Sequence, residues 1–283
     1  MPPPSLPPHH LDIIGAENSD RVPVLCLHGL FAGGWVFDHL RPLIAERGYP
    51  AAALSFRGHP PNPPSRKMGG HSITDYCLDA CEAARVLDRP IVIGHSLGGL
   101  VALMLVGRNL ARAAILVSPA PPRGISVLSP GVLARMAMYL PALLLSRAFL
   151  PFASHLDALV LNRVPEADRA ELRSRFVADS GKAARQAALG IFTVPPRAIR
   201  APILVVGAEH DRFIPLTVAR RVAQMYSAPL HVAQGHGHFL FAEPGWEREA
   251  KVMLDWIDDL PRVMRDASAE VGKRPLRTNS TVG

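Results

Sequence analysis

The sequence has few of the features that mark secreted, membrane-spanning or disulfide-stabilised proteins. It contains three cysteines in 283 residues, Cys26, Cys77 and Cys81, which are too few for a disulfide framework and are predicted to be small buried thiols. No uninterrupted apolar run reaches the roughly 18 residues that a membrane span needs. The opening stretch MPPPSLPPHH has neither the basic nor the apolar region of a secretory signal. We therefore expect a cytoplasmic protein without stable membrane insertion.

The chain also lacks a basic block, although its formal net charge is +7. A positive excess can indicate an anionic partner such as a nucleic acid. Here the arginines are spread through the whole chain, and no stacking aromatic residues accompany them. This distribution is typical of a solvated surface and argues against nucleic-acid binding.

What the sequence does contain is an alternation of strand and helix patterns. Six short apolar runs end in turn residues, as strands buried on both faces of a sheet do. They are residues 22–27, 51–56, 90–94, 113–118, 202–207 and 229–233. Helix-length segments lie between them, and one begins with Ser72 and Asp75 at the spacing of a capping box. The alternation predicts an α/β fold with a mostly parallel central sheet and helices on both faces.

The alternation fails between two proline-rich joints, where several helical patterns occur without a strand pattern. We predict a helical cap insertion over residues 120–198. It interrupts one α/β core made of residues 11–119 and 199–263. Residues 1–10 and 264–283 lack periodicity and are predicted to be flexible tails.

A glycine-rich turn around Ser96 connects the predicted strand 90–94 to a predicted helix over residues 97–110. Its pattern, Gly-His-Ser-Leu-Gly, is informative in this context because a tight strand-to-helix turn exposes the serine Oγ at the carboxyl edge of the sheet. The helix N-terminus also directs amide donors toward an anion that develops beside the serine. The sequence therefore predicts that Ser96 is a nucleophile.

A serine nucleophile needs a base and an acidic group that orients the base. Two downstream loops, each just beyond the carboxyl end of a predicted strand, offer such groups. The first loop contains Glu209 and Asp211, and the second contains His236 and His238. The spacing alone leaves open which acid and which histidine act. A His-x-His pair can also bind a metal ion, but no neighbouring residue completes such a site.

Four motifs together make the chain similar to the α/β-hydrolase superfamily, in particular to its small serine esterases with a helical cap. The motifs are HGLFAGGW (28–35), GHSLGG (94–99), GAEHDRFIP (207–215) and GHFLFAEP (237–244). The resemblance covers roughly residues 12–262 and implies an α/β-hydrolase fold. It aligns Asp211 with the family's acid and His238 with its base, with His236 as the alternative base.

The resemblance further implies an oxyanion hole formed by the backbone N–H groups of Leu30 and Leu97. Phe31 is the alternative to Leu30, one residue along the chain. His28, Phe31 and His95 are candidates for the substrate pocket, and His28 is also expected to brace its loop by hydrogen bonding. No metal ion or organic cofactor is implied.

The sequence departs from the family pattern at one place. Many relatives carry D-x-R-G-x-G after the fourth strand, and Ser55 stands here where aspartate is common. That aspartate is not a triad member, so the change affects only the expected bracing of the local loop. The proline-rich stretch over residues 57–70 is expected to form a stiff loop near the mouth of the site.

Together these residues predict a serine hydrolase that cleaves a small-molecule carboxylic ester through a Ser-His-Asp triad and an acyl-enzyme. The apolar residues of the predicted cap favour an apolar acyl or alcohol group, although caps also need such residues to pack. Thioesterases, lactonases, C–C bond hydrolases and cofactor-free perhydrolases use the same triad and are alternatives. Serine at position 96 argues against dehalogenases and epoxide hydrolases, which carry aspartate there. A non-catalytic binding protein on this fold is a remote alternative, since all three triad members are present.

Overall fold

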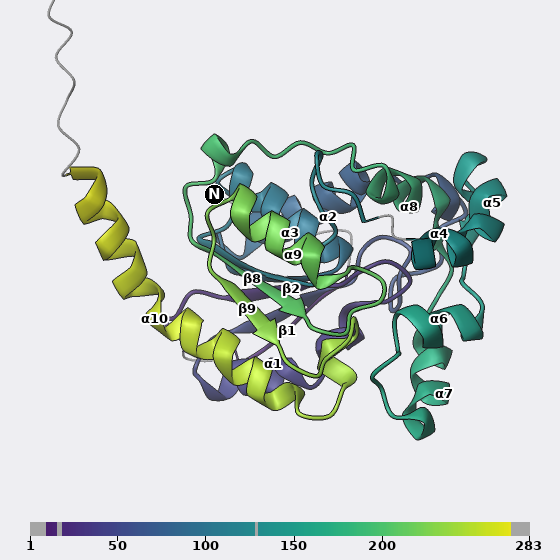
Figure 1. Ribbon diagram of the computed structural model, residues 1–283. Helices are drawn as coiled ribbons and strands as arrows, with labels where there is room; N and C mark the ends of the chain where they lie inside the picture. The colour runs from purple at the N-terminus through teal and green to yellow at the C-terminus, as the bar shows by residue number, and fades with distance from the viewer. Residues whose placement is uncertain (1–9, 16–18, 128–129, 273–283) are drawn as a thin grey trace, which may run out of the picture.

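The computed structural model describes residues 10–15, 19–127 and 130–272, and its centre is a seven-stranded sheet (Figure 1). The strand order is β1-β3-β2-β4-β5-β8-β9. All neighbouring strands are parallel except β1, which pairs antiparallel with β3. The strands are β1 (Leu11–Ile14), β2 (Val24–Leu27), β3 (Ala51–Leu54), β4 (Ile91–His95), β5 (Ala113–Val117), β8 (Ile203–Ala208) and β9 (Leu230–Ala233).

The sheet confirms the predicted fold class. All six predicted strands are present, with bounds that shift by one or two residues. The sequence missed β1 because this strand pairs at the sheet edge and is only partly buried. Four residues of which three are half-buried and one, Ile13, is exposed give neither a continuous apolar run nor a clear alternation.

Helices cover both faces of the sheet. They are η1 (Gly34–Phe37), α1 (Leu40–Glu46), η2 (Met68–Gly70), α2 (Ile73–Val86), α3 (Leu97–Gly107), α9 (Leu216–Met225), η5 (Leu240–Ala242) and α10 (Trp246–Gly272). Successive strand side chains point to opposite faces. In β2, Leu25 and Leu27 therefore pack with α2, α3 and α9, whereas Val24 and Cys26 pack with α1 and α10. Figure 1 shows these two groups of helices on opposite sides of the sheet. All three cysteines are free and buried in these cores, as predicted.

Residues 120–198, which we call the cap segment, lie between β5 and β8 and add no strand to the main sheet in their described part. Their helices are α4 (Pro130–Met136), η3 (Ala137–Tyr139), α5 (Leu140–Leu144), α6 (Ala153–Leu159), α7 (Glu166–Arg175), α8 (Gly181–Ala188) and η4 (Pro196–Ala198). The segment also contains strands β6 (Ala148–Phe149) and β7 (Asp179–Ser180), which pair antiparallel with each other. The sequence predicted no strand here, since a two-residue strand is too short to show an alternating pattern. In Figure 1 the helices α4 to α7 lie together at one side of the sheet.

Helix α10 is longer than predicted. Its backbone stays helical through residues 264–272, which the sequence assigned to a tail without periodicity. This stretch contains alanine and glutamate, which favour a helix, and extension of an existing helix needs no apolar face. The predicted tail residues 1–9 and 273–283 lie outside the described part of the chain. In the part that is described, no helix is both long and apolar enough to cross a bilayer.

Helix α2 begins with the capping box that the sequence predicted. The Ser72 Oγ accepts a hydrogen bond from the Asp75 N–H at 3.2 Å, and the Asp75 carboxylate accepts one from the Ser72 N–H at 2.7 Å. The first amides of a helix have no acceptor within the helix. The capping box therefore satisfies two donors at the start of α2.

We expect Ser72→Ala to lower the free energy of unfolding by about 1 kcal/mol, because the Asp75 N–H loses its acceptor. Urea denaturation followed by circular dichroism measures this change. The matched control is Thr74→Ala, which alters an exposed residue of the same helix and should change the free energy by less than about 0.5 kcal/mol. Equal effects of the two substitutions would contradict the capping role.

Candidate active site

Ser96 lies on the turn between β4 and α3, as predicted. Its backbone has φ 55° and ψ −118°, a conformation with positive φ that costs about 1–3 kcal/mol. The turn also needs a close approach of α3 to β2, because a Cβ at Gly98 would overlap the carbonyl oxygen of Leu27. This geometry places the Ser96 side chain at the carboxyl end of the sheet, where a nucleophile elbow presents its serine.

Asp211 and His238 come from the loops that follow β8 and β9, and their side chains are hydrogen-bonded. The His238 Nδ1 lies 2.8 Å from Asp211 Oδ2. The other carboxylate oxygen accepts hydrogen bonds from the N–H groups of Phe213 at 2.9 Å and Ile214 at 2.7 Å. A carboxylate only accepts, so this contact places the imidazole proton on Nδ1. The His238 Nε2 is then free to accept a proton.

Ser96 and His238 line the same cavity, together with Gly29 and Leu30 of the loop that follows β2. Gly29 lies directly against the serine, since a Cβ there would be 2.8 Å from the Ser96 Cβ. Among the described residues, none forms a hydrogen bond with the Ser96 Oγ. Catalytic hydrogen bonds often tighten only in the complex with substrate.

Two backbone amides near Ser96 are candidates to bind an anion, because neither has an acceptor among the described residues. Leu97 is the first residue of α3, so its N–H has no acceptor within the helix and lies at the positive end of the helix dipole. The Leu30 N–H donates to no acceptor in the described part of the chain. The Phe31 N–H, the alternative donor, instead donates to the Asp179 carboxylate at 2.8 Å. The geometry therefore favours Leu30 over Phe31 as the second oxyanion donor.

His28 braces the loop that carries Leu30. The His28 Nε2 accepts a hydrogen bond from the Phe56 N–H at 3.1 Å, which leaves the proton on Nδ1. Nδ1 donates to the Gly29 carbonyl oxygen at 2.7 Å. Burial lowers the pKa of His28 to about 3, and nearby His59 contributes to the decrease, so the ring is neutral. His28 is fully buried and lines neither cavity at the site, so its expected place in the substrate pocket is wrong.

His95 and Phe31 do line the cavity beside Ser96. The His95 Nε2 lies 2.8 Å from the carbonyl oxygen of His238 and donates to it. Burial lowers the pKa of His95 to about 3, and His238 contributes, so His95 is neutral and its Nδ1 is an acceptor. That Nδ1 has no partner among the described residues. His95 thus fixes the main chain of His238 from the side of the cavity.

The alternative acid and base have other partners. Glu209 is exposed, and its carboxylate accepts a hydrogen bond from the Gly235 N–H at 2.8 Å. The His236 Nδ1 lies 3.2 Å from Glu243, which also accepts from the Gly237 N–H at 2.6 Å. The two histidines of the loop therefore face different carboxylates. No group of three or more His, Cys, Asp or Glu side chains within the described ranges could hold a metal ion.

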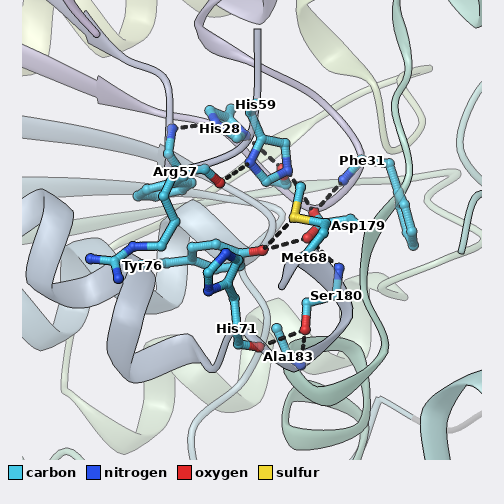
Figure 2. Close-up of polar contacts among 12 residues, drawn as sticks. His28, Phe31, Arg57, His59, Met68, His71, Tyr76, Asp179, Ser180 and Ala183 are labelled. Carbon is cyan, nitrogen blue, oxygen red and sulfur yellow. Dashed lines mark hydrogen bonds and ion pairs between the residues drawn. The ribbon is translucent and has the colours of Figure 1, made fainter. Parts of the chain in front are cut away.

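Sequence reasoning missed a buried polar cluster that contacts the loop of the predicted oxyanion donors (Figure 2). It consists of Asp179 in β7, Tyr76 in α2 and His59 in the loop after β3. The proline-rich stretch 57–70 thus contributes His59 to a buried contact with the cap segment. No local signal marks the cluster, because its members are far apart in the sequence.

A second cavity, of about 420 Å³, extends from Ser96 into the cap segment. Its walls are largely apolar, with contributions from α4, α5 and α8 that include Leu133, Met136, Leu143, Ala184 and Ala188. Leu30 and Leu97 also line it, so the cavity starts at the two amides that can bind an anion. Such a cavity suits an apolar group attached to a carbonyl held at Ser96.

Comparisons with known proteins agree with this fold. Residues 24–250 match the model of the alpha/beta hydrolase family. The putative carbamate hydrolase RutD of Variovorax paradoxus (strain S110) is 28% identical over 247 residues, which are 82% of this chain and 89% of that protein. A serine hydrolase-like protein of Dictyostelium discoideum is 31% identical over 88 residues, which are 30% of this chain and only 24% of that protein. A soluble variant of monoglyceride lipase from Saccharomyces cerevisiae has a similar structure, with a TM-score of 0.74, 16% identity, and coverage of 89% of this chain and 91% of that one.

The chain belongs to the alpha/beta hydrolase family, because the family model matches most of its length. The likeness to the yeast lipase, at its low identity, shows the fold alone. The activities of these relatives are not carried over by the matches themselves.

The base can be identified by comparing the two histidines of the loop after β9. We expect His238→Gln to slow the labelling of Ser96 by a fluorophosphonate by about 100-fold or more, because the serine loses its proton acceptor. His236→Gln, which keeps a polar side chain beside Glu243, should change the rate only a few-fold. Mass spectrometry of the labelled peptide against time gives both rates. The opposite order of the two variants would assign the base to His236.

Proposed function

We propose that this protein is a serine hydrolase that cleaves carboxylic esters with an apolar acyl or alcohol group. The observation that carries the proposal is the strained Ser96 turn, set in one cavity with the hydrogen-bonded His238–Asp211 pair. Structural restraint at a positive-φ serine is typical of a functional site. The family to which the chain belongs supports hydrolysis as the class of reaction.

The first half of the proposed reaction forms an acyl-enzyme. The His238 Nε2 removes the proton from the Ser96 Oγ as this oxygen bonds to the ester carbonyl carbon. The carbonyl oxygen becomes an oxyanion that the N–H groups of Leu30 and Leu97 stabilise. When the tetrahedral intermediate collapses, the C–O bond to the alcohol breaks. The alcohol leaves with the proton that His238 had taken.

The second half releases the acid. A water molecule donates a proton to the His238 Nε2 and bonds to the acyl carbon, and the same two amides again hold the oxyanion. The bond between the acyl carbon and the Ser96 Oγ then breaks, and His238 returns the proton to the serine. Asp211 keeps the His238 ring in the required tautomer and stabilises the imidazolium that forms in each half. Each step uses side chains, backbone amides and water.

The apolar part of the substrate is assigned to the cavity of about 420 Å³ that extends from Ser96 into the cap segment, the larger of the two cavities at the site. Its described lining is largely apolar, and the polar side chains that line it are Ser96 and Arg185. Burial of one methylene contributes about 0.8 kcal/mol. A chain that extends from Ser96 into this cavity would therefore bind more strongly with each added carbon until the cavity is filled.

The proposal predicts turnover of a p-nitrophenyl ester series from acetate to dodecanoate. We expect kcat/KM to rise roughly two- to fourfold for each methylene that enters the cavity, as its burial free energy implies. Ser96→Ala should lower kcat by about 10⁴-fold or more, whereas the control Ser154→Ala, at an exposed position of the cap segment, should retain wild-type rates. Assay of a p-nitrophenyl carbamate tests for carbamate hydrolysis, the activity that the relative RutD is named for. Absence of all turnover together with an unlabelled Ser96 would overturn the proposal, and tight binding of esters without turnover would indicate a binding protein.

A cavity-filling substitution tests where the apolar group binds. Ala188 lines the larger cavity from α8, so Ala188→Phe should lower kcat/KM for the decanoate ester by about tenfold or more and leave the acetate ester within twofold. Ala170→Phe adds the same volume at an exposed position of α7 and should leave both esters unchanged. Steady-state kinetics on the two esters decide the point. A loss that is equal for the two esters would place the apolar group elsewhere.

A further inference from the structure

The Asp179 carboxylate is fully buried and accepts hydrogen bonds from four donors (Figure 2). Its Oδ2 accepts from the Phe31 N–H at 2.8 Å and from the His59 Nε2 at 2.9 Å. Its Oδ1 accepts from the Tyr76 hydroxyl and from the Ser180 N–H, each at 2.5 Å. One side chain of the cap segment thus joins the loop after β2, the loop after β3 and helix α2.

The contact with Phe31 holds a residue whose backbone is strained. Phe31 has φ 67°, a left-handed conformation that is unusual for a bulky residue. Its N–H is held by Asp179, and its carbonyl oxygen accepts a hydrogen bond from the Val177 N–H at 2.8 Å. Both polar groups of this strained residue are therefore bound by residues 177–179 of the cap segment. Such a conformation persists where its surroundings over-determine it.

The Leu30 N–H lies between two peptide units that are held from outside the loop. On one side, His28 holds the carbonyl of the Gly29–Leu30 peptide, and in a trans peptide the N–H of Leu30 points the opposite way. On the other side, Asp179 holds the N–H of the Leu30–Phe31 peptide. These two contacts determine the backbone angles of Leu30. The direction of its N–H is thereby set by two side chains that do not line the cavity with Ser96.

The buried carboxylate is compensated by a buried histidine. The His59 Nε2 faces Asp179 and the His59 Nδ1 faces the Arg57 carbonyl oxygen at 3.2 Å, so both ring nitrogens have acceptors and both can carry protons. Burial acts to lower the pKa of His59, but the Asp179 charge and hydrogen bond outweigh it and raise that pKa above its ordinary value. Burial likewise acts to raise the pKa of Asp179, and the charge of His59 and the hydrogen bonds lower it instead. The pair is therefore held as an ion pair.

We propose that Asp179 is a positioning residue of the oxyanion hole, which holds the Phe31 peptide so that the Leu30 N–H faces the carbonyl attacked by Ser96. The inference rests on the proposed function, and it gives the cap segment a part in the chemistry. Asp179 touches no substrate in this scheme and acts through Phe31. If residues 177–179 moved off the loop, the Phe31 backbone would lose the partners of both its N–H and its carbonyl at once. Packing of residues 177–179 against this loop and formation of the oxyanion hole are thus coupled.

The test separates oxyanion binding from binding of the apolar group. We would measure kcat, KM, the inhibition constant of an alkyl boronic acid, and the dissociation constant of a long-chain alcohol for the wild type and for Asp179→Asn. The boronic acid forms a tetrahedral adduct on Ser96 whose oxygen occupies the oxyanion position, whereas the alcohol fills the apolar cavity alone. We expect kcat and boronic acid affinity to fall together by about 10- to 100-fold, somewhat less than for removal of an oxyanion donor itself. KM and alcohol affinity should stay within about twofold.

The matched control is Asp157→Asn. Asp157 is another carboxylate of the cap segment, bonded to Arg173 at 2.6 and 2.7 Å rather than to the loop of Leu30. This variant should match the wild type in all four measurements. A second variant, His59→Gln, keeps a donor toward Asp179 but removes the compensating charge, and it should lower kcat and boronic acid affinity in parallel by a smaller factor. It keeps the proposal testable if Asp179→Asn does not fold.

Two outcomes would overturn the assignment in an active enzyme. One is an Asp179→Asn variant with wild-type kcat and boronic acid affinity. The other is a variant in which boronic acid and alcohol affinities fall equally, which would indicate a general loss of structure. If the wild type hydrolyses no ester, the proposed function fails instead. The boronic acid and fluorophosphonate reactions of Ser96, compared across the same variants, then still decide whether Asp179 positions the oxyanion donor.

Discussion

The candidate active site depends on how closely helix α3 approaches the backbone of strand β2. The approach is possible because Gly98 has no Cβ, which would overlap the Leu27 carbonyl oxygen. Because α3 lies so close, a single residue with positive φ, Ser96, connects β4 to α3. The Ser96 N–H donates to the Val117 carbonyl, and the Ser96 carbonyl accepts from the Ala120 N–H, each at 2.9 Å. These two bonds belong to β5 and to the first residue of the cap segment. These two hydrogen bonds hold a backbone that is strained by about 1–3 kcal/mol, and they fix the position of the Ser96 side chain at the carboxyl end of the sheet.

A second positive-φ residue, Phe31, lines the same cavity as Ser96, and its restraint comes from a different part of the chain. The Ser96 backbone is held by Val117 of β5 and by Ala120 just beyond that strand, whereas both polar groups of the Phe31 backbone are held by residues 177–179. The two halves of the site therefore differ in what fixes them. The proposed nucleophile is fixed at the end of β5, and the loop that carries the proposed donor Leu30 is fixed by contact between the core and residues 177–179. The same segment lines most of the apolar cavity, so the proposed substrate pocket and the proposed oxyanion loop share one structural element.

The parts of the fold and site that could be predicted are those with a local signal. The Ser96 turn follows from glycine spacing between a strand and a helix, and Asp211 and His238 follow strands whose carboxyl ends meet at one edge of a parallel sheet. Contacts over a long sequence distance gave no such signal. Asp179 lies 148 positions from Phe31, and two-residue strands such as β7 have no periodicity. The length of α10 was missed for another reason, because helix extension there does not depend on an apolar face.

The buried histidines around the site take different charge states, and each state follows from the partners of the ring. His28 meets a donor at Nε2 and an acceptor at Nδ1, which requires the neutral tautomer, whereas His59 meets acceptors at both nitrogens. Their ring centroids are 4.9 Å apart, so two positive charges there would repel each other strongly. A charged His59, balanced by Asp179, therefore helps keep His28 neutral, in addition to the effect of burial. The neutral ring donates to the Gly29 carbonyl, and Asp179 accepts from the Phe31 N–H. The ion pair thus supports both peptides that flank Leu30. Asp179 holds the Leu30–Phe31 peptide directly, and His59 supports the Gly29–Leu30 peptide by keeping His28 neutral.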